Sequence, residues 1–327
     1  MPEGYTHVRT AQKAAHAIHY KLQCPAAFAA GANGPDSFFC YEVWKKGQNR
    51  TYNLPLLGNR MHEDKTGAFL LALLHHTHTQ AQIEYTLGFL CHYAADTVMH
   101  PYVVFVSSPG QPYGMKGGHG YFEIALDSTL HAEDTGVSEV PADDSSPVPV
   151  GQDLAEIAAL LHRCILEVYG QDISVEALAD SFYYTYRLRR LFTSRHGVRR
   201  AFYWVLELFF GGRGFITGHV SPAHLKLNLP EDWTDPATGE ERHGGAFAAE
   251  GCPAPLRAVY DGRPWPLDGQ AGRGNSGKDP WQHELHHRYR NRAKQKPTSA
   301  GCGTGRRNRL TSPRPTFADR LLQHERN

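Results

Sequence analysis

The chain has 327 residues, of which 41% are hydrophobic and 20% are charged, a composition typical of a folded globular protein. No run approaches the roughly 20 apolar residues that a transmembrane helix needs. The net charge of +1 conceals an asymmetry, because residues 273–327 carry 13 basic and 4 acidic side chains while the rest of the chain is net acidic. Basic tails of this kind are typical of segments that contact nucleic acid or anionic surfaces.

The N-terminus and the cysteines indicate the compartment. The first residues, MPEGYTHVRTAQKAAHAI, contain neither the apolar segment nor the small-residue cleavage site of a secretory signal. The six cysteines are scattered and form no CxxC pair, which favours free thiols in a reducing compartment over a disulfide framework. We therefore expect a cytoplasmic protein.

Helical periodicity dominates the first two-thirds of the chain. In its first part, amphipathic patterns predict helices over residues 8–22, 36–44, 64–78 and 79–100. Thr6 is a candidate N-cap for the first helix, and Pro35 suits the first turn of the second. The polar stretch 45–59 predicts a loop, and Pro101 is expected to stop the last of these helices.

The rest of the body is expected to be helical as well. Residues 107–118 and 133–152 are rich in turn-forming and polar residues, which predicts a surface loop and a linker. Wide apolar faces of helical period predict further helices over 119–131, 153–169, 174–194 and 198–210. No strand-like alternation of useful length occurs, so we predict an all-α body.

Beyond Leu229 the composition shifts to Gly, Pro, Arg and His, and apolar periodicity is lost. Such a segment cannot bury enough apolar surface to offset the entropy lost on ordering. We therefore predict a helical domain over residues 1–232 and a mostly irregular, basic tail over 233–327, with a short helix at 317–324. Residues 233–236 are expected to close the domain. Three interpretations of the tail stay open: contact with an anionic membrane surface, a disordered extension, or a frame artefact.

A stripe of polar residues marks the predicted helix before Pro101. His92, Asp96 and His100 recur at i, i+4 and i+8, so they face the same way among apolar neighbours. Buried imidazoles and carboxylates without partners cost several kcal/mol, and zinc is a natural partner for both groups. The alternative is two core histidines satisfied by hydrogen bonds beside an exposed aspartate.

Further candidate ligands flank this stripe. His119 and Glu123 lie at i and i+4 of the next predicted helix, a spacing that is also common on solvated helix faces. His7, Asp36 and His62 lie near predicted helix starts and would be ordinary residues if seen alone. Taken together, the eight residues are imidazoles and carboxylates, which are typical zinc ligands.

The order Thr6-His7, Gly34-Pro35-Asp36, Met61-His62, His92-x3-Asp96-x3-His100 and His119-x3-Glu123 resembles the zinc-dependent phospholipase C family of bacteria. It is also similar to the catalytic region of glycosylphosphatidylinositol-specific phospholipase D and, more distantly, to the zinc-dependent single-strand nucleases of fungi. The resemblance covers residues 1–130 and is nearest to the members without a signal peptide. It implies an all-α, multi-helix bundle of the phospholipase C and single-strand nuclease type.

The resemblance also implies three zinc ions held between the helices. The first would be bound by Asp36, His62, His92 and Asp96, the second by His100, His119 and Glu123, and the third by His7 and Asp96. Secreted members complete the third site with the amino group and carbonyl of a processed N-terminal tryptophan, whereas this sequence has Met1 six residues before His7. We therefore expect two to three zinc ions.

The implied activity is hydrolysis of a phospholipid phosphodiester by metal-activated water. Asp36 is expected to be catalytic, orienting or deprotonating that water as a general base. Two alternatives stay open: a metal-dependent phosphoesterase or nuclease that acts on another substrate, and a catalytically silent zinc-binding domain. The expected partners are a phospholipid or other phosphodiester substrate and an anionic membrane surface, with no stable nucleic-acid partner. His219 and His224 have no spacing that assigns them to the ligand set.

Overall fold

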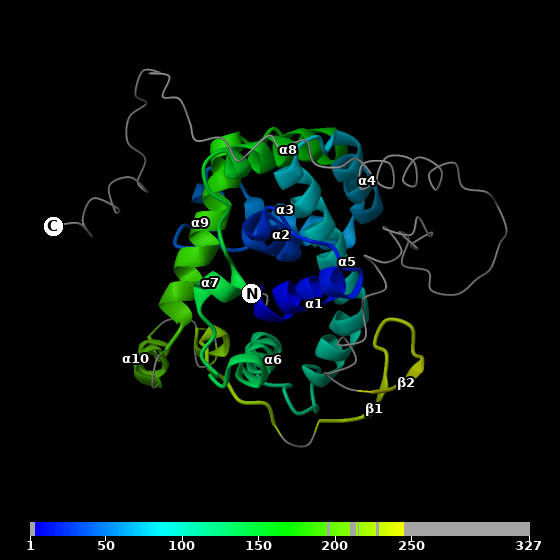
Figure 1. The fold of residues 1–327 in the computed structure, drawn as a ribbon. Helices are drawn as coiled ribbons and strands as arrows, with labels where there is room; N and C mark the ends of the chain where they lie inside the picture. The colour runs from blue at the N-terminus through cyan, green and yellow to red at the C-terminus, as the bar shows by residue number, and fades with distance from the viewer. Residues whose placement is uncertain (1–3, 195–196, 210–213, 215, 227–228, 245–327) are drawn as a thin grey trace. The chain divides into compact units, whose positions relative to one another are not determined.

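The computed structural model describes residues 4–194, 197–209, 214, 216–226 and 229–244. The helices in this part of the chain are α1 (Gly4–Ala17), α2 (Pro25–Ala32), the 3-10 helices η1 (Gly34–Phe38) and η2 (Gly47–Asn49), α3 (Leu54–Glu63), α4 (Thr66–His76), α5 (Gln80–Val106), α6 (Gly118–Thr135), α7 (Ala142–Ser145), α8 (Gln152–Tyr169), α9 (Val175–Phe192), α10 (Val198–Leu206) and η4 (Thr217–His219). Two short strands, β1 (Asp232–Thr234) and β2 (Glu241–His243), pair antiparallel. The prediction of an all-α protein is confirmed (Figure 1).

α5 is the helix around which the others are arranged (Figure 1). It begins with a capping box between Thr79 and Gln82. Its first half contributes Tyr85 and other residues to a core shared with α3, α4, α8 and α9. Its last turns contribute Tyr102 and others to a second core shared with α6 and β1. The predicted ligand stripe on α5 lies between these two cores.

The predicted stop at Pro101 is wrong, because this proline lies inside α5. Proline removes one helical hydrogen bond and normally ends or kinks a helix. Here Tyr102, Val103 and Val106 follow it and are buried against Phe122 of α6. Burial of one such side chain contributes about 1.5–3 kcal/mol, so the packing beyond Pro101 offsets the lost hydrogen bond.

Some stretches that the sequence assigns to loops are helical. α3 begins inside the expected loop 45–59, where the side chain of Asn53 accepts a hydrogen bond from the Leu56 amide and Pro55 occupies the first turn. Asn-x-Pro is a helix-start signal, and it lies inside the stretch predicted to be a loop. α2 lies between the helices predicted over 8–22 and 36–44, and α7 lies within the expected linker 133–152.

The described part of the predicted tail packs against α5. The Trp233 ring of β1 is buried edge-on against Tyr102, with the ring centroids 5.3 Å apart, and its Nε1 donates to the Gly244 carbonyl. This agrees with the expectation that residues 233–236 close the domain. The division at residue 232 stays a prediction, since residues 245–327, with the expected helix at 317–324, lie outside the described residues. No helix in the described ranges is long and apolar enough to cross a membrane.

Candidate metal centre

The eight predicted ligands come from five elements that meet around α5. They are His7 of α1, Asp36 of η1, His62 of α3, His92, Asp96 and His100 of α5, and His119 and Glu123 of α6. Their ligand atoms form three groups in which all atoms lie within 4.8 Å of one another: His7 with Asp36 and His92, His62 with His92 and Asp96, and His100 with His119 and Glu123. The structure thus brings together residues that are more than a hundred positions apart in the sequence.

Two imidazoles and two carboxylates converge at the centre of the site. His62 Nε2 lies 3.1 Å from Asp36 Oδ1 and 3.5 Å from Asp96 Oδ2. His92 Nε2 lies 3.5 Å from Asp96 Oδ2 and 3.9 Å from Asp36 Oδ2. The side chains of His92 and Asp36 are only 2% and 5% exposed. The four residues expected to hold the first zinc therefore lie close together, and each imidazole faces both carboxylates.

The hydrogen bonds on the far side of each ring determine what its Nε2 can do. His62 Nδ1 lies 2.7 Å from the Gly58 carbonyl, and His92 Nδ1 lies 3.2 Å from the Ala32 carbonyl. Because a carbonyl can only accept, Nδ1 must carry the hydrogen, and Nε2 of a neutral ring is then a lone-pair acceptor. His92 Nε2 is buried and has no hydrogen-bond partner. A lone-pair acceptor that faces carboxylates, as His92 Nε2 does, suits a cation, and zinc fits the donor set.

The pKa values agree with this picture. Burial lowers the pKa of His92 to about 4, so its ring is neutral at pH 7. Burial also acts to lower the pKa of His62, but the hydrogen bond and charge of Asp36 outweigh it and raise that pKa to about 9. Burial acts to raise the pKa of Asp36, but the imidazoles around it hold the pKa below its usual range. Without metal, a proton on His62 is therefore the cation that this group holds.

Gly34 lets η1 approach the ring of His92. Its φ is +54°, and a Cβ built on it would lie 2.2 Å from His92 Cδ2. Any other residue would thus displace the imidazole, as well as strain the backbone. The glycine and the following Pro35 place Asp36 in the first turn of η1, where the carboxylate is buried.

The second group is more open to solvent. His119 Nε2 lies 3.0 Å from Glu123 Oε1 and 3.4 Å from His100 Nε2. The side chain of His119 is 42% exposed, whereas that of Glu123 is 12% exposed. A group of three protein ligands with one solvent-facing side is the pattern of a catalytic zinc site, which keeps a position open for water or substrate.

Asp96 and His7 connect the two groups. Asp96 directs Oδ2 toward His62 and His92, while its Oδ1 lies 3.4 Å from His7 Nε2. The buried Nδ1 of His7 has no hydrogen-bond partner. A cavity between these residues is lined by His7, Asp96, His100 and Glu123. The two carboxylate oxygens of Asp96 therefore face different imidazoles, Oδ1 facing His7 and Oδ2 facing His62 and His92.

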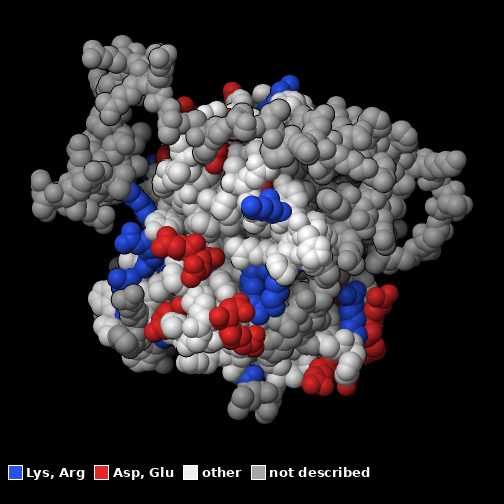
Figure 2. All heavy atoms as spheres, viewed as in Figure 1, with Lys and Arg blue, Asp and Glu red and all other residues white. Residues whose placement is uncertain are grey.

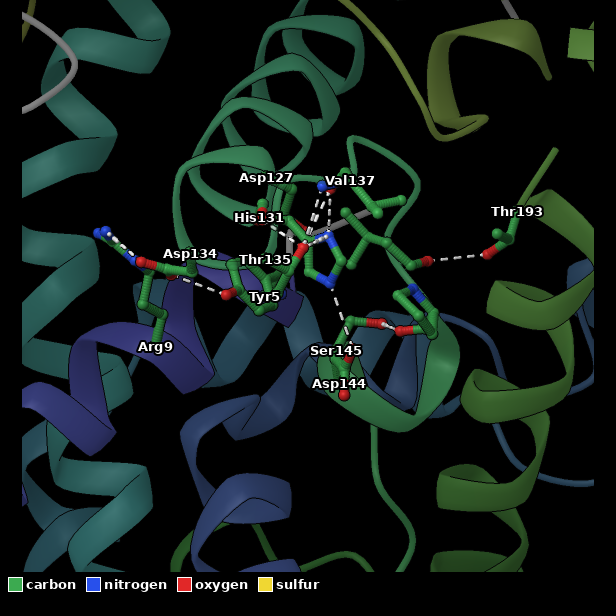
Figure 3. A network of polar contacts seen from close by, with 12 residues as sticks. Tyr5, Arg9, Asp127, His131, Asp134, Thr135, Val137, Asp144, Ser145 and Thr193 are labelled. Atoms are coloured by element: carbon green, nitrogen blue, oxygen red, sulfur yellow. Dashed lines mark hydrogen bonds and ion pairs between the residues drawn. The ribbon is translucent and has the colours of Figure 1, made fainter. Parts of the chain in front are cut away.

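α6 positions the N-terminus of α1 (Figure 3). The buried carboxylate of Asp127 accepts hydrogen bonds from the amides of Tyr5 and Thr6, at 3.0 and 2.7 Å, and from the Thr6 hydroxyl. One turn further along α1, Arg9 pairs with Asp134 of α6. The expected N-cap at Thr6 is wrong, because α1 begins at Gly4 and Asp127 supplies the negative group at its N-terminus. These contacts fix the turn that carries His7.

His219, which the sequence does not assign to the ligand set, lies next to the second group. Its ring lies against Gly120, where an added Cβ would be 2.3 Å from His219 Cε1, so it is next to the turn that carries His119. Its buried Nδ1 has no hydrogen-bond partner, and burial lowers its pKa to about 3. No periodic signal links residues a hundred positions apart, so only the packing of η4 on α6 reveals this neighbour.

The sequence matches one family of known proteins. A family model for zinc-dependent phospholipase C matches residues 6–187, a span that includes all eight candidate ligands and more than half of the chain. Searches of curated proteins and of solved structures found no match. On the evidence of the matched family model, this chain belongs to the zinc-dependent phospholipase C family.

Proposed function

We propose that this protein is a zinc-dependent hydrolase of phospholipids that cleaves a phosphodiester in the manner of a phospholipase C. The observation that carries the proposal is the proximity of the imidazole nitrogens of His62 and His92 to the carboxylate oxygens of Asp36 and Asp96. Family membership supports zinc as the cation and a phospholipid as the substrate. The half-exposed second group offers a route by which a phosphate group reaches the buried one.

We propose that two to three zinc ions bind in this centre. The first is held by Asp36, His62, His92 and Asp96, the second by His100, His119 and Glu123, and the third by His7 and Asp96. When bound, zinc lowers the pKa of a water molecule and neutralises charge on phosphoryl oxygens. Three zinc ions bind if His7 and Asp96 alone hold the third ion, and two bind otherwise.

Asp36 is the proposed catalytic residue. Its carboxylate is buried, and its lowered pKa keeps it ionised at neutral pH, so it can orient the attacking water and accept its proton. The water oxygen forms a bond to phosphorus, the bond from phosphorus to the glycerol oxygen breaks, and the released alkoxide takes a proton from solvent. Asp96 faces His7 through Oδ1 and His62 through Oδ2.

The test combines metal content with turnover of two substrates. Elemental analysis of the purified protein should give two to three zinc ions per chain, and the enzyme should hydrolyse a chromogenic choline phosphodiester faster than single-stranded DNA. No zinc after zinc-supplemented expression would contradict the metal centre. Faster hydrolysis of DNA would favour a nuclease, and bound zinc without either activity would favour a silent zinc-binding domain.

A matched pair of histidine variants on α1 separates the site from the fold. His7 belongs to the centre, whereas His16 is exposed on the same helix. We expect His7→Ala to lose part of the zinc and most of the turnover, and His16→Ala to keep both. Equal zinc content and turnover in the two variants would remove His7 from the ligand set.

A further inference from the structure

α10 and the residues on either side of it expose an apolar surface. Of the seventeen large hydrophobic residues that are exposed in the described chain, seven lie between residues 191 and 209. They are Leu191, Val198, Phe202, Trp204, Val205, Leu208 and Phe209, with exposed fractions from 46% to 77%. Scattered apolar residues on a surface are ordinary, but a contiguous group of this kind marks an interaction site.

The inner face of α10 is polar, the reverse of the usual arrangement. Arg200, Tyr203 and Glu207 share one side of the helix, and Tyr203 is its only residue that is fully buried in the described structure. The Tyr203 hydroxyl donates to the Leu191 carbonyl, and the Arg200 guanidinium donates to the Val220 carbonyl. α10 is thus attached to the body by polar contacts, and its aromatic residues point outward.

Glu207 fixes this orientation. Its buried carboxylate accepts hydrogen bonds from the Gly214 amide at 3.0 Å and from the amide and hydroxyl of Thr217 at 2.5 and 2.9 Å. Rotating α10 to bury its apolar face would leave these amides and the carboxylate without partners, which is costly in a buried position. Among the described residues, the apolar face is therefore held outward and is left without a packing partner.

The exposed charged residues of the described part of residues 187–209 are basic. Arg190 and Arg199 are exposed, and Arg199 lies over the junction of α9 and α10, where it donates to the Arg190 and Thr193 carbonyls. Figure 2 shows basic side chains where α9 meets α10, with acidic side chains beside them. Asp143 is one acidic neighbour, since it accepts a hydrogen bond from Tyr186, whose ring lies under Arg190. The only acidic residue from residue 187 to 209 is the buried Glu207. A basic rim around exposed aromatics complements an anionic, partly apolar surface.

The apolar surface is joined to the metal centre. η4 packs against both α10 and α6. The Arg200 guanidinium lies 5.6 Å from the ring centroid of Tyr121, and Tyr121 lies on α6 between His119 and Glu123. The helix that exposes aromatic residues is therefore attached to the helical turns that carry the solvent-facing ligands.

We propose that residues 191–209 are the surface by which this protein docks on a bilayer that contains anionic phospholipid. Phe202, Val205 and Phe209, which share one face of α10 and its continuation, enter the boundary between headgroups and acyl chains. Arg190 and Arg199 contact lipid phosphates. A symmetric contact with a second copy is disfavoured because it would bring two arginine rims together. The inference rests on the proposed function only for what the enzyme does after docking, because docking can be measured without hydrolysis.

The first experiment measures binding of the full chain to vesicles of phosphatidylcholine with and without phosphatidylglycerol. It is done in the Asp36→Asn background, so that hydrolysis does not alter the vesicles. We expect Phe202→Ser/Phe209→Ser to weaken binding at least about tenfold, since each phenylalanine loses apolar burial. The control is Val150→Ser/Leu166→Ser, which removes exposed apolar residues elsewhere and should bind like the parent.

Binding that is absent in the parent, or equal in the two double variants, would overturn the proposal. Arg190→Gln/Arg199→Gln should weaken binding only to vesicles that contain phosphatidylglycerol, and the remaining binding should depend less on salt. Sedimentation without lipid tests the competing occupant. A parent that dimerises through this surface, with Phe202→Ser/Phe209→Ser monomeric and equally bound to vesicles, would assign the surface to a second copy.

A second readout separates this inference from the proposed function. In the otherwise unchanged chain, Phe202→Ser/Phe209→Ser should keep its turnover of a water-soluble choline phosphodiester and lose most of its turnover of vesicle phospholipid. Phospholipid turnover unchanged on vesicles would overturn the docking surface and leave the hydrolase intact. Vesicle binding that depends on α10, with no hydrolysis of any phosphodiester, would overturn the hydrolase and leave the docking surface intact.

Discussion

α5 and α10 both direct polar side chains into the protein, but different parts of the two helices are left without a contact. On α5, His92 and Asp96 present acceptor atoms to each other, and His92 Nε2 has no hydrogen-bond partner. On α10, Tyr203 and Glu207 are matched by backbone groups, and the apolar face is exposed. A polar inward face alone therefore does not show what kind of group the helix binds. The hydrogen bonds distinguish the two helices: they leave His92 Nε2 of α5 without a partner inside the protein, and they hold the apolar face of α10 exposed among the described residues.

The largest expected effect is at the α5 side of this comparison. His92→Ala removes a buried ligand, so we expect loss of zinc and a fall in turnover of at least about 10³-fold. Elemental analysis and a phosphodiester assay measure both. His16→Ala is the control for histidine removal. If His92→Ala keeps its zinc, His92 is not a ligand, and the difference that we infer between α5 and α10 is contradicted for α5.

Asp36→Asn separates catalysis from metal binding at the same centre. Asparagine keeps the shape of the side chain but cannot accept a proton, so we expect turnover to fall at least about a hundredfold. Most of the zinc should remain, because His62, His92 and Asp96 are unchanged. Turnover at the wild-type rate would mean that Asp36 only places a negative charge at the start of η1.

Glu207→Gln tests the α10 side. Loss of the carboxylate leaves buried amides poorly matched, and we expect a cost of about 1–3 kcal/mol in the free energy of unfolding. Hydrogen exchange should rise in residues 198–217, while zinc content is unchanged. Equal exchange in the two proteins would show that Glu207 does not hold α10 in its orientation.

The pH dependence of this contact has a defined sign. Burial acts to raise the pKa of Glu207, but the amides of Thr217, Gly214 and Ile216 outweigh it and lower that pKa below its usual 4.5. The stability that Glu207 contributes is therefore fully present above about pH 4.5 and is lost as the pH falls through the lowered value. Acid unfolding of the wild type and of Glu207→Gln should converge at low pH.

The smallest expected effect is that of Tyr203→Phe. The change removes one hydrogen bond, from the hydroxyl to the Leu191 carbonyl, and keeps the packed ring, so we expect a loss of about 0.5–1.5 kcal/mol. Chemical denaturation measures it. If Tyr203→Phe lowers the free energy of unfolding as much as Glu207→Gln does, the two contacts contribute equally to the orientation of α10.

The sequence predicts the metal centre better than the surface. His92, Asp96 and His100 follow helical spacing, so one stripe is visible without a structure, and the resemblance adds the ligands from other elements. His219 has no such signal, because its position depends on how η4 packs against α6. The wide apolar face over residues 198–210 is typical of a core face, yet the structure exposes it. Its orientation depends on the partners of Glu207, which periodicity does not reveal.

The clamp between α6 and α1 constrains how this centre can change. Glu123, Asp127 and Asp134 lie along one face of α6, so the same helix holds a candidate ligand and fixes the turn of His7. One residue inserted between Glu123 and Asp127 would rotate the two halves of that face by about 100° relative to each other. The ligand and the clamp would then point in different directions. α6 therefore tolerates substitutions in its outer positions far better than any change in its length.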